Sequence, residues 1–215
     1  MASSLYSVAK PKQARSEKTL RRLLEAAERL VEAEGFGAIS IADIVREAGS
    51  SVGGFYSRFR DKDELLLALH ERFMQQTDAR LDELMRPEAW EGASLRDVVR
   101  TCVRELVDVY GGRRMLLGAF VAQSASDPEM RRRGLRFRQR VIERFCELVL
   151  RHRDEIAHPN AERAVELGAQ MFFALMTEFL IFGGLRVGGE PLGEEELITE
   201  LERNFLAYVT DAPTT

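Results

Sequence analysis

Residues 40–62 constrain this chain more than any other segment, because they predict two short helices separated by a tight turn. Ser40 is a favourable N-cap, and Asp43 at the third helical position forms a weaker version of the Ser-x-x-Glu capping box. The apolar residues that follow recur at helical spacing: Ile41, Ile44, Val45 and Ala48. Gly49 comes directly after them, where a helix ends at the lowest cost. The segment therefore begins as a short amphipathic helix that stops at a turn.

A second helix is expected after Ser50 or Ser51, either of which could cap it. Its apolar side is predicted to bury Val52, Phe55 and Phe59. The other side carries small and polar residues, namely Ser51, Gly53, Gly54, Tyr56, Ser57 and Arg58. Two adjacent glycines inside a helix cost about 1 kcal/mol each relative to alanine. Close approach of the backbone to another surface would offset that cost.

Two short helices joined in this way are typical of the helix-turn-helix, whose second helix enters the major groove of DNA. An ordinary three-helix corner with solvated polar residues would show much of the same pattern. Asp61 is expected to cap a third helix, with Glu64 completing its box. Lys62 would then lie at the positive end of that helix, where a phosphate could compensate its charge.

The segment resembles the TetR family of bacterial transcriptional regulators. The signature Ser-x-Gly-x-x-Tyr-x-x-Phe-x-x-Lys-x-x-Leu is matched at every fixed spacing by Ser51, Gly53, Tyr56, Phe59, Lys62 and Leu65. The likeness is specific over residues 16–66, and beyond them only length and helical character agree. Ala42 and Gly54 depart from the family pattern at positions where many members carry a polar residue or a threonine.

The resemblance implies which residues contact double-stranded DNA at a palindromic operator. Phosphate contacts carry over to Ser40, Tyr56 and Lys62, and groove contacts to Val52, Gly53, Gly54 and Ser57. To these we add Ser51 on the polar side of the second helix and Arg58, whose guanidinium could grip a phosphate or reach a guanine edge.

The distribution of charge agrees with a basic head on an acidic body. The whole chain has a formal net charge of −4. Residues 1–62 hold 11 Lys and Arg against 8 Asp and Glu, a net of +3, and include every lysine of the chain. The remaining residues hold 20 against 27, a net of −7. Residues 1–15 are expected to form a disordered basic arm that could follow phosphates or enter a minor groove.

Periodicity along the rest of the chain predicts an all-α protein of about nine helices. Expected helices run from about residue 16 to a stop at Gly35 or Gly37, then over 61–85, 94–110, 113–125, 128–156, 160–187 and 193–210. Residues 16–62 would form a three-helix, helix-turn-helix DNA-binding domain. The long helix after Asp61 would join it to a C-terminal ligand-binding and dimerisation domain over residues 63–215.

The last two predicted helices indicate a homodimer. Residues 171–185 are apolar nearly all round, and a chain of this size has little interior in which to bury such a helix. The alternative is that both helices complete a monomeric core. The interface residues expected are Leu175, Ile181, Leu197, Leu201, Phe205 and Tyr208.

Residues 86–190 mix large apolar side chains with isolated polar ones, a pattern that could line a pocket for a small effector. Taken singly, each apolar residue is more often ordinary core. Glu178 stands out, because a carboxylate inside an apolar run needs a partner or a route to water. The expected lining is Trp90, Tyr110, Met115, Phe120, Gln123, Phe137, Arg138, Phe172, Met176, Glu178 and Phe179.

Other chemistry is not indicated. Gly49-Ser50-Ser51-Val52-Gly53 has hydrolase-elbow spacing, but a helix rather than a strand precedes it. The three histidines lack metal spacing, no cofactor motif is present, and Cys102 and Cys146 are expected to be cytosolic thiols. No segment is long and apolar enough to span a membrane. The sequence thus predicts a cytoplasmic, dimeric repressor, not an enzyme, released from its operator by a mainly apolar ligand. The alternatives are a helical interaction module or a small-molecule enzyme without DNA binding.

Overall fold

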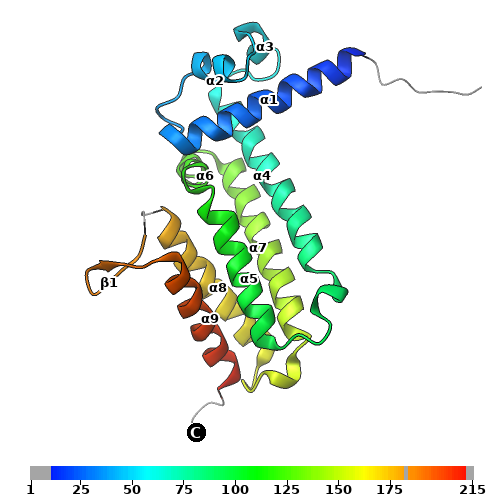
Figure 1. Ribbon diagram of the computed structural model, residues 1–215, viewed down its shortest axis with the longest axis vertical. Helices are drawn as coiled ribbons and strands as arrows, with labels where there is room; N and C mark the ends of the chain where they lie inside the picture. Colours follow the sequence, from blue (N-terminus) through cyan, green and yellow to red (C-terminus); the bar gives the residue numbers. More distant parts are fainter. Residues whose placement is uncertain (1–10, 182–183, 212–215) are drawn as a thin grey trace, which may run out of the picture. The chain divides into compact units, whose positions relative to one another are not determined.

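A computed structural model describes residues 11–181 and 184–211, and helices dominate throughout (Figure 1). The chain divides into two compact units, Met1–Arg72 and Phe73–Thr215. The helices of this described part are α1 (Pro11–Glu34), α2 (Ile41–Glu47), α3 (Val52–Tyr56), α4 (Lys62–Leu84), α5 (Leu95–Gly111), α6 (Arg114–Ser126), α7 (Pro128–Leu150), α8 (Ala161–Ile181) and α9 (Glu194–Thr210). The all-α prediction is therefore confirmed.

Helix starts in the structure follow the capping residues of the sequence. Ser40 caps α2 in a complete capping box with Asp43, and Ser94 caps α5 in the same way. Asp127 caps α7, with Pro128 at its first position. At the start of α4, the Glu64 backbone N–H donates to Asp61. The Glu64 side chain, however, accepts from the Arg60 backbone N–H at 2.6 Å, so this box is shifted by one residue from the predicted one.

The start of α1 and the ends of α7 and α8 differ more from the prediction. α1 begins at Pro11, five residues earlier than expected, because proline is tolerated in a first turn where its missing N–H is not needed. α7 stops at Leu150, and the residues expected to continue it form a separate 3-10 turn, Arg153–Glu155. α8 stops at Ile181 and not near 187. A further 3-10 turn covers Pro87–Trp90.

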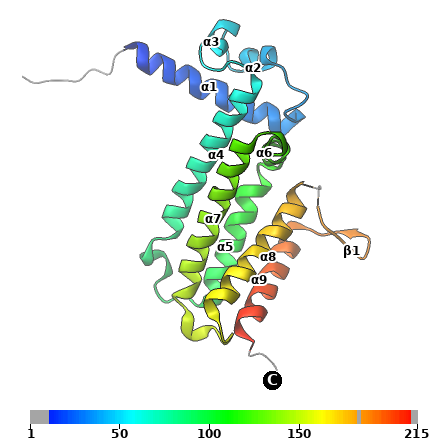
Figure 2. The same cartoon turned by 180° about the vertical axis from the view of Figure 1, so that it is seen from behind.

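Two short antiparallel strands, β1 (Arg186–Val187) and β2 (Glu190–Pro191), replace the end of the predicted 160–187 helix. Arg186 pairs with Pro191, and Val187 pairs with Glu190. Gly188 and Gly189 form the turn with positive φ values of 60° and 90°, which glycine adopts without strain. The hairpin projects from the α8–α9 pair in both views (Figures 1 and 2).

In the first unit, α2 and α3 pack near α1, and the core contains Leu23, Ala27, Ile44, Phe55 and Leu65, all fully buried. In the second unit, α8 and α9 lie side by side in both views, as do α5 and α9 (Figure 2). α4 runs without interruption through the division between the units, from Lys62 to Leu84. Within residues 11–181 and 184–211, no helix combines the length and apolar character needed to cross a bilayer.

Candidate nucleic-acid interface and regulatory cavity

The short helix α3 presents an exposed face that does not serve the protein core. Ser51 caps it by accepting from the Gly54 backbone N–H at 3.0 Å. Tyr56 is 56% exposed, and Gly53 and Ser57 are also exposed. Phe55 is fully buried and anchors the helix, with ring centroids 5.3 Å from Phe59.

Val52 belongs to this exposed face. The expectation that the second helix buries Val52 is wrong, because half of the side chain is accessible to solvent. It is the first residue of the five-residue helix, and it stays at the edge of the packed interior that Phe55 enters. An apolar side chain exposed there can contact a thymine methyl group in a groove, which agrees with the contact implied by the resemblance.

The two glycines of α3 differ in their surroundings. A Cβ placed on Gly54 would lie 2.8 Å from the Ser50 hydroxyl oxygen, so the packing inside the domain already disfavours a side chain there. A Cβ on Gly53 would meet nothing closer than the Ser51 hydroxyl at 4.0 Å. The protein itself thus has no steric reason for glycine at position 53. A surface that approaches from outside would supply one.

Ser40 is exposed but engaged locally. Its hydroxyl accepts from the Asp43 backbone N–H at 3.2 Å and lies 2.5 Å from an Asp43 carboxylate oxygen. These bonds from Ser40, together with Arg46, lower the pKa of Asp43 from its usual 3.8 to about 2. The predicted phosphate contact would have to share this hydroxyl with the cap of α2.

Lys62 is the site residue whose position departs most from the expectation of a free cation. Its Nζ donates to the carbonyl oxygens of Phe36 at 2.7 Å and Ile39 at 2.9 Å, and lies 4.6 Å from the centroid of the Phe36 ring. The ammonium group therefore closes the loop between α1 and α2. One of its three N–H donors remains for a phosphate.

Arg58 also turns inward. Its guanidinium donates to the Gly54 carbonyl at 2.8 Å and to the Ser16 carbonyl and hydroxyl at 3.1 and 3.0 Å. Arg22 of α1 donates to the carbonyls of Ala48 and Gly49 in the turn before α3. Sequence analysis did not single out Arg22 or Ser16, because a basic residue on an amphipathic helix carries no sign of the carbonyl it will meet.

Several residues predicted to line an effector pocket pack against one another in the core of the second unit. Tyr110, Phe120 and Phe137 pack around Phe73, with ring centroids 6.0 to 6.3 Å from it, and burial raises the pKa of Tyr110 to about 12. Phe172, Met176 and Phe179 are buried core residues. The aromatic pattern mostly marks the packed interior of the second unit.

The polar members of that predicted set lie near the surface. Glu178 is exposed, so its carboxylate already has the route to water that the sequence pattern called for. Met115 is 48% exposed, and Arg138 donates to Gln170 at 3.3 Å. Gln123 is half-buried, and Trp90 donates from Nε1 to the Leu84 carbonyl at 2.6 Å.

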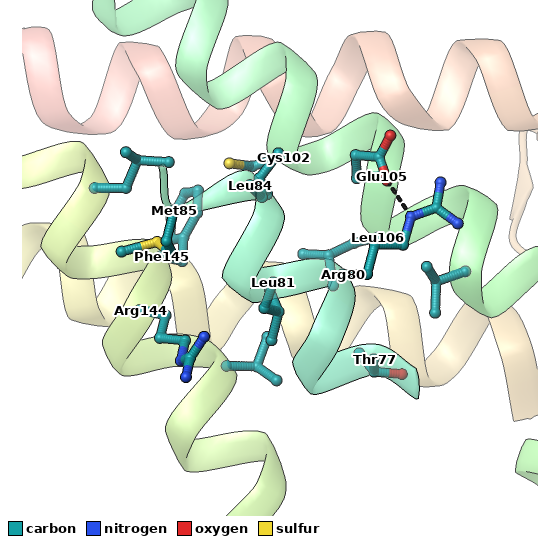
Figure 3. A pocket seen from close by; sticks show the side chains of 13 residues that line it. Thr77, Arg80, Leu81, Leu84, Met85, Cys102, Glu105, Leu106, Arg144 and Phe145 are labelled. Carbon is teal, nitrogen blue, oxygen red and sulfur yellow. Dashed lines mark hydrogen bonds and ion pairs between the residues drawn. The ribbon is translucent and has the colours of Figure 1, made fainter. Parts of the chain in front are cut away.

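A cavity does exist in the second unit, between α4, α5 and α7 (Figure 3). Its volume is about 30 Å³, which is room for about two water molecules. Its rim carries an ion pair between Arg80 and Glu105, with 2.6 Å between Nε and Oε2. Arg144, also at the rim, pairs with Asp82. The lining consists of Thr77, Arg80, Leu81, Leu84, Met85, Cys102, Glu105, Leu106, Val109, Val141, Arg144, Phe145 and Leu148.

Three of the six residues predicted for a dimer interface belong to the core of the single chain. Leu197, Leu201 and Phe205 are at most 5% exposed, and Tyr208 is partly exposed. The side chain of Ile181 lies outside the part that the structure describes. Leu175 is 42% exposed and lies on α8 four residues after Met171 and eight after Leu167, which are 39% and 45% exposed. We call these three residues the α8 stripe.

Comparison with solved structures places the fold among known regulators. The chain is similar to a TetR transcription regulator from Haloarcula marismortui, with a TM-score of 0.68 and 16% identity over 90% of this chain and 97% of that one. It is also similar to a transcriptional regulator from Cytophaga hutchinsonii (TM-score 0.67, 14% identity, 89% and 98% covered). A third is GusR of Salmonella enterica (TM-score 0.63, 17% identity, 95% and 99% covered).

The N-terminal unit carries the more specific match. Residues 23–69 match the family model described as bacterial regulatory proteins, tetR family. This range contains α2, α3, the turn between them and the first residues of α4. Residues 23–69 are therefore a segment of the tetR family of bacterial regulatory proteins, and the fold of the chain is that of these solved regulators.

Proposed function

We propose that this protein is a homodimeric, cytoplasmic repressor that binds a palindromic operator and releases it when a small apolar ligand occupies its C-terminal domain. Residues 16–62 would form the DNA-binding domain and 63–215 the ligand-binding and dimerisation domain. Of the basic arm expected over residues 1–15, residues 11–15 are not disordered but form the first turn of α1, and residues 1–10 lie outside the described part. We assign the chain no enzymatic activity and no cofactor.

The exposed face of α3 carries the proposal for DNA. Val52, Gly53, Tyr56 and Ser57 lie on that face, and Gly53 has no steric partner that would require glycine. A helix that enters the major groove needs small residues where its backbone comes closest to the bases and a hydroxyl that can reach a phosphate. Tyr56 is placed to supply that hydroxyl.

Selection from a pool of random duplexes tests DNA binding directly. Purified protein should enrich one palindromic sequence whose half-sites are about 34–36 Å, or one helical turn, apart. Tyr56→Phe should weaken binding to the selected duplex and to unrelated duplexes about equally, because a phosphate contact carries no sequence information. If no sequence is enriched at modest ionic strength, the proposal fails.

The α8 stripe supports the dimer. Leu167, Met171 and Leu175 are four residues apart along one helix, so their side chains share a face. Each is about two-fifths exposed or more, although most large apolar residues of the second unit are buried. Apolar surface of this kind is stabilised when a second copy covers it, and regulators of this family are usually dimers.

The cavity beside α4 supports the effector site. Leu81 and Leu84 of α4 line it from one side, and residues of α5 and α7 line it from the others (Figure 3). A ligand larger than the present space would have to displace α4, and α4 continues to Lys62 at the DNA-binding domain. Release would then be a population shift whose size equals the ligand's preference for the displaced state.

A further inference from the structure

The recognition helix α3 depends on the rest of the domain for its direction. It is five residues long, and two of these are glycines. A helix this short is not stable without contacts from the rest of the protein. Phe55 and the following Phe59 anchor it in the core, where α2 packs beside it. Two arginine side chains add polar contacts between α1 and the segments at either end of α3.

Arg58 makes such contacts at the C-terminal end. One guanidinium nitrogen donates to the Gly54 carbonyl and to the Ser57 hydroxyl, at 2.8 and 2.9 Å. The other donates to the carbonyl and the hydroxyl of Ser16 in α1, 42 positions earlier. The planar group thus joins the last turn of α3 to α1 and places a positive charge where the helix dipole is negative.

Arg22 makes a second contact from α1, in the turn before α3. It donates to the carbonyls of Ala48, the C-cap of α2, and Gly49, three residues before α3 begins. Gly49 has a φ of +55°, and a Cβ at that position would lie 2.6 Å from the Arg22 guanidinium. α1 thus holds the C-terminal end of α3 through Arg58 and the turn that leads into α3 through Arg22.

We propose that Arg22 and Arg58 are positioning residues for DNA recognition, which set the angle of α3 from α1 without contacting DNA themselves. This inference rests on the proposed function, because it assumes that α3 enters the groove. It gives Arg58 a structural role in place of the base or phosphate contact that the sequence analysis predicted. Its guanidinium already donates four hydrogen bonds within the domain.

Positioning and direct contact differ in two measurable quantities. A residue that neutralises a phosphate lowers the dependence of log K on log [salt] by about 1 when it is removed, and it weakens specific and non-specific binding alike. A residue that only aims α3 affects base contacts, which depend on register. Its removal should reduce the ratio of specific to non-specific affinity and leave the salt dependence unchanged.

The experiment compares Arg58→Ala, Arg58→Lys and Arg22→Ala with Arg21→Ala on the selected duplex and on an unrelated duplex, over a range of salt concentrations. Arg21 is a matched control, because it lies on α1 and pairs with Glu25, and its replacement by alanine removes the same charge. We expect Arg58→Ala and Arg22→Ala to weaken specific binding by about tenfold or more, with non-specific binding close to that of Arg21→Ala. Arg58→Lys should be nearly as weak, since lysine keeps the charge but not the planar fork.

Three outcomes would overturn the inference: a fall of the salt slope by about 1 for Arg58→Ala but not for Arg21→Ala, full rescue by Arg58→Lys, or unchanged specific affinity. Thermal melting shows whether each variant is folded at the assay temperature. If an alanine variant is not, Ser16→Ala removes only the hydroxyl acceptor of Arg58 and should show a smaller loss of specificity. Failure of the wild type to select any duplex would instead contradict the proposed function.

Discussion

Three basic side chains of the first unit bind the protein's own backbone. Arg22, Arg58 and Lys62 each donate to carbonyl oxygens of another element or loop. A carbonyl at a helix end or in a turn has no partner within secondary structure, so a cation is a good donor for it. From sequence, such a cation cannot be distinguished from one that faces a phosphate, because both lie at polar positions.

Lys62 allows the two roles to be separated. Lys62→Ala leaves the Phe36 and Ile39 carbonyls without a donor, and we expect it to destabilise the domain by about 2 kcal/mol, the cost of a lost bond to a charged donor. We expect the salt slope of DNA binding to stay unchanged. Denaturant unfolding and a salt titration measure the two quantities. Lys18→Ala is the control, because Lys18 is exposed and has the same charge. A slope lowered by about 1 with unchanged stability would instead assign Lys62 to a phosphate.

Substitution of Gly53 should change stability and DNA binding in opposite directions. Gly53→Ala adds a Cβ in open space on a helix, so it should stabilise the domain by up to about 1 kcal/mol. The same Cβ should weaken binding to the selected duplex, because it occupies space that the groove would fill. Gly118→Ala is the matched control, since Gly118 also lies within a helix and a Cβ there meets nothing. Increased stability with unchanged DNA affinity would show that nothing approaches Gly53.

Most helix boundaries were predictable from sequence, but the start of α1 and the ends of α7 and α8 were not. Ser40 and Asp127 mark their helices because a side-chain oxygen satisfies a backbone N–H within three residues, a purely local interaction. The ends of α7 and α8 fall where apolar periodicity continues. After α7 comes a 3-10 turn whose Glu155 accepts from the Leu95 backbone N–H, 60 positions earlier, a contact that local periodicity does not reveal. After α8 comes the β1–β2 hairpin, whose turn is formed by Gly188 and Gly189. Because the capping box of α2 is a local interaction, its contribution to the stability of the domain can be tested with a single substitution.

The carboxylate of Asp43 makes the stability of α2 depend on pH. Its pKa is lowered from 3.8 to about 2, so the folded protein holds the charged form more strongly than the unfolded chain does. The stabilisation is complete above about pH 4 and is lost as the pH falls through about 2. We expect Asp43→Asn to unfold at lower denaturant concentration at pH 6 and to show a weaker decline between pH 4 and 2. Equal declines in the two proteins would contradict this role.

In the second unit, the sequence indicated which residues are apolar and lie on one face of a helix, but not which neighbour covers that face. The large apolar side chains of α8 and α9 were expected to meet a second chain, yet Leu197, Leu201 and Phe205 fill the core of their own. The predicted pocket likewise consists largely of rings that pack on one another, whereas the cavity lies beside α4. Periodicity gives the apolar face of a helix but not the neighbour that covers it, because that depends on how all helices pack.

The oligomeric state distinguishes the two apolar surfaces. Leu175→Glu places a charge in the exposed α8 stripe, so it should convert a dimer into monomers with little change in the stability of the monomer fold. Leu201→Ala removes buried methyl groups and should cost about 2–5 kcal/mol of stability without specifically dissociating the dimer. Sedimentation at several concentrations and denaturant unfolding measure the two effects. A Leu175→Glu protein that remains dimeric would remove the α8 stripe from the interface.

The cavity beside α4 predicts the charge of its ligand. Both guanidinium groups at its rim are already paired, Arg80 with Glu105 and Arg144 with Asp82, and the rest of the lining is almost entirely apolar. A charged ligand would have to break one of these pairs or enter without a counterion, which burial makes costly. We therefore expect 1-octanol to raise the melting temperature and weaken DNA binding more than octanoate or octylamine at equal concentration.

Val109→Phe, which fills the cavity, should abolish the response to octanol, and Val187→Phe in the exposed hairpin should leave it intact. A stronger response to octanoate would show that the ligand replaces a carboxylate at Arg80 or Arg144, and equal responses in both variants would place the site elsewhere.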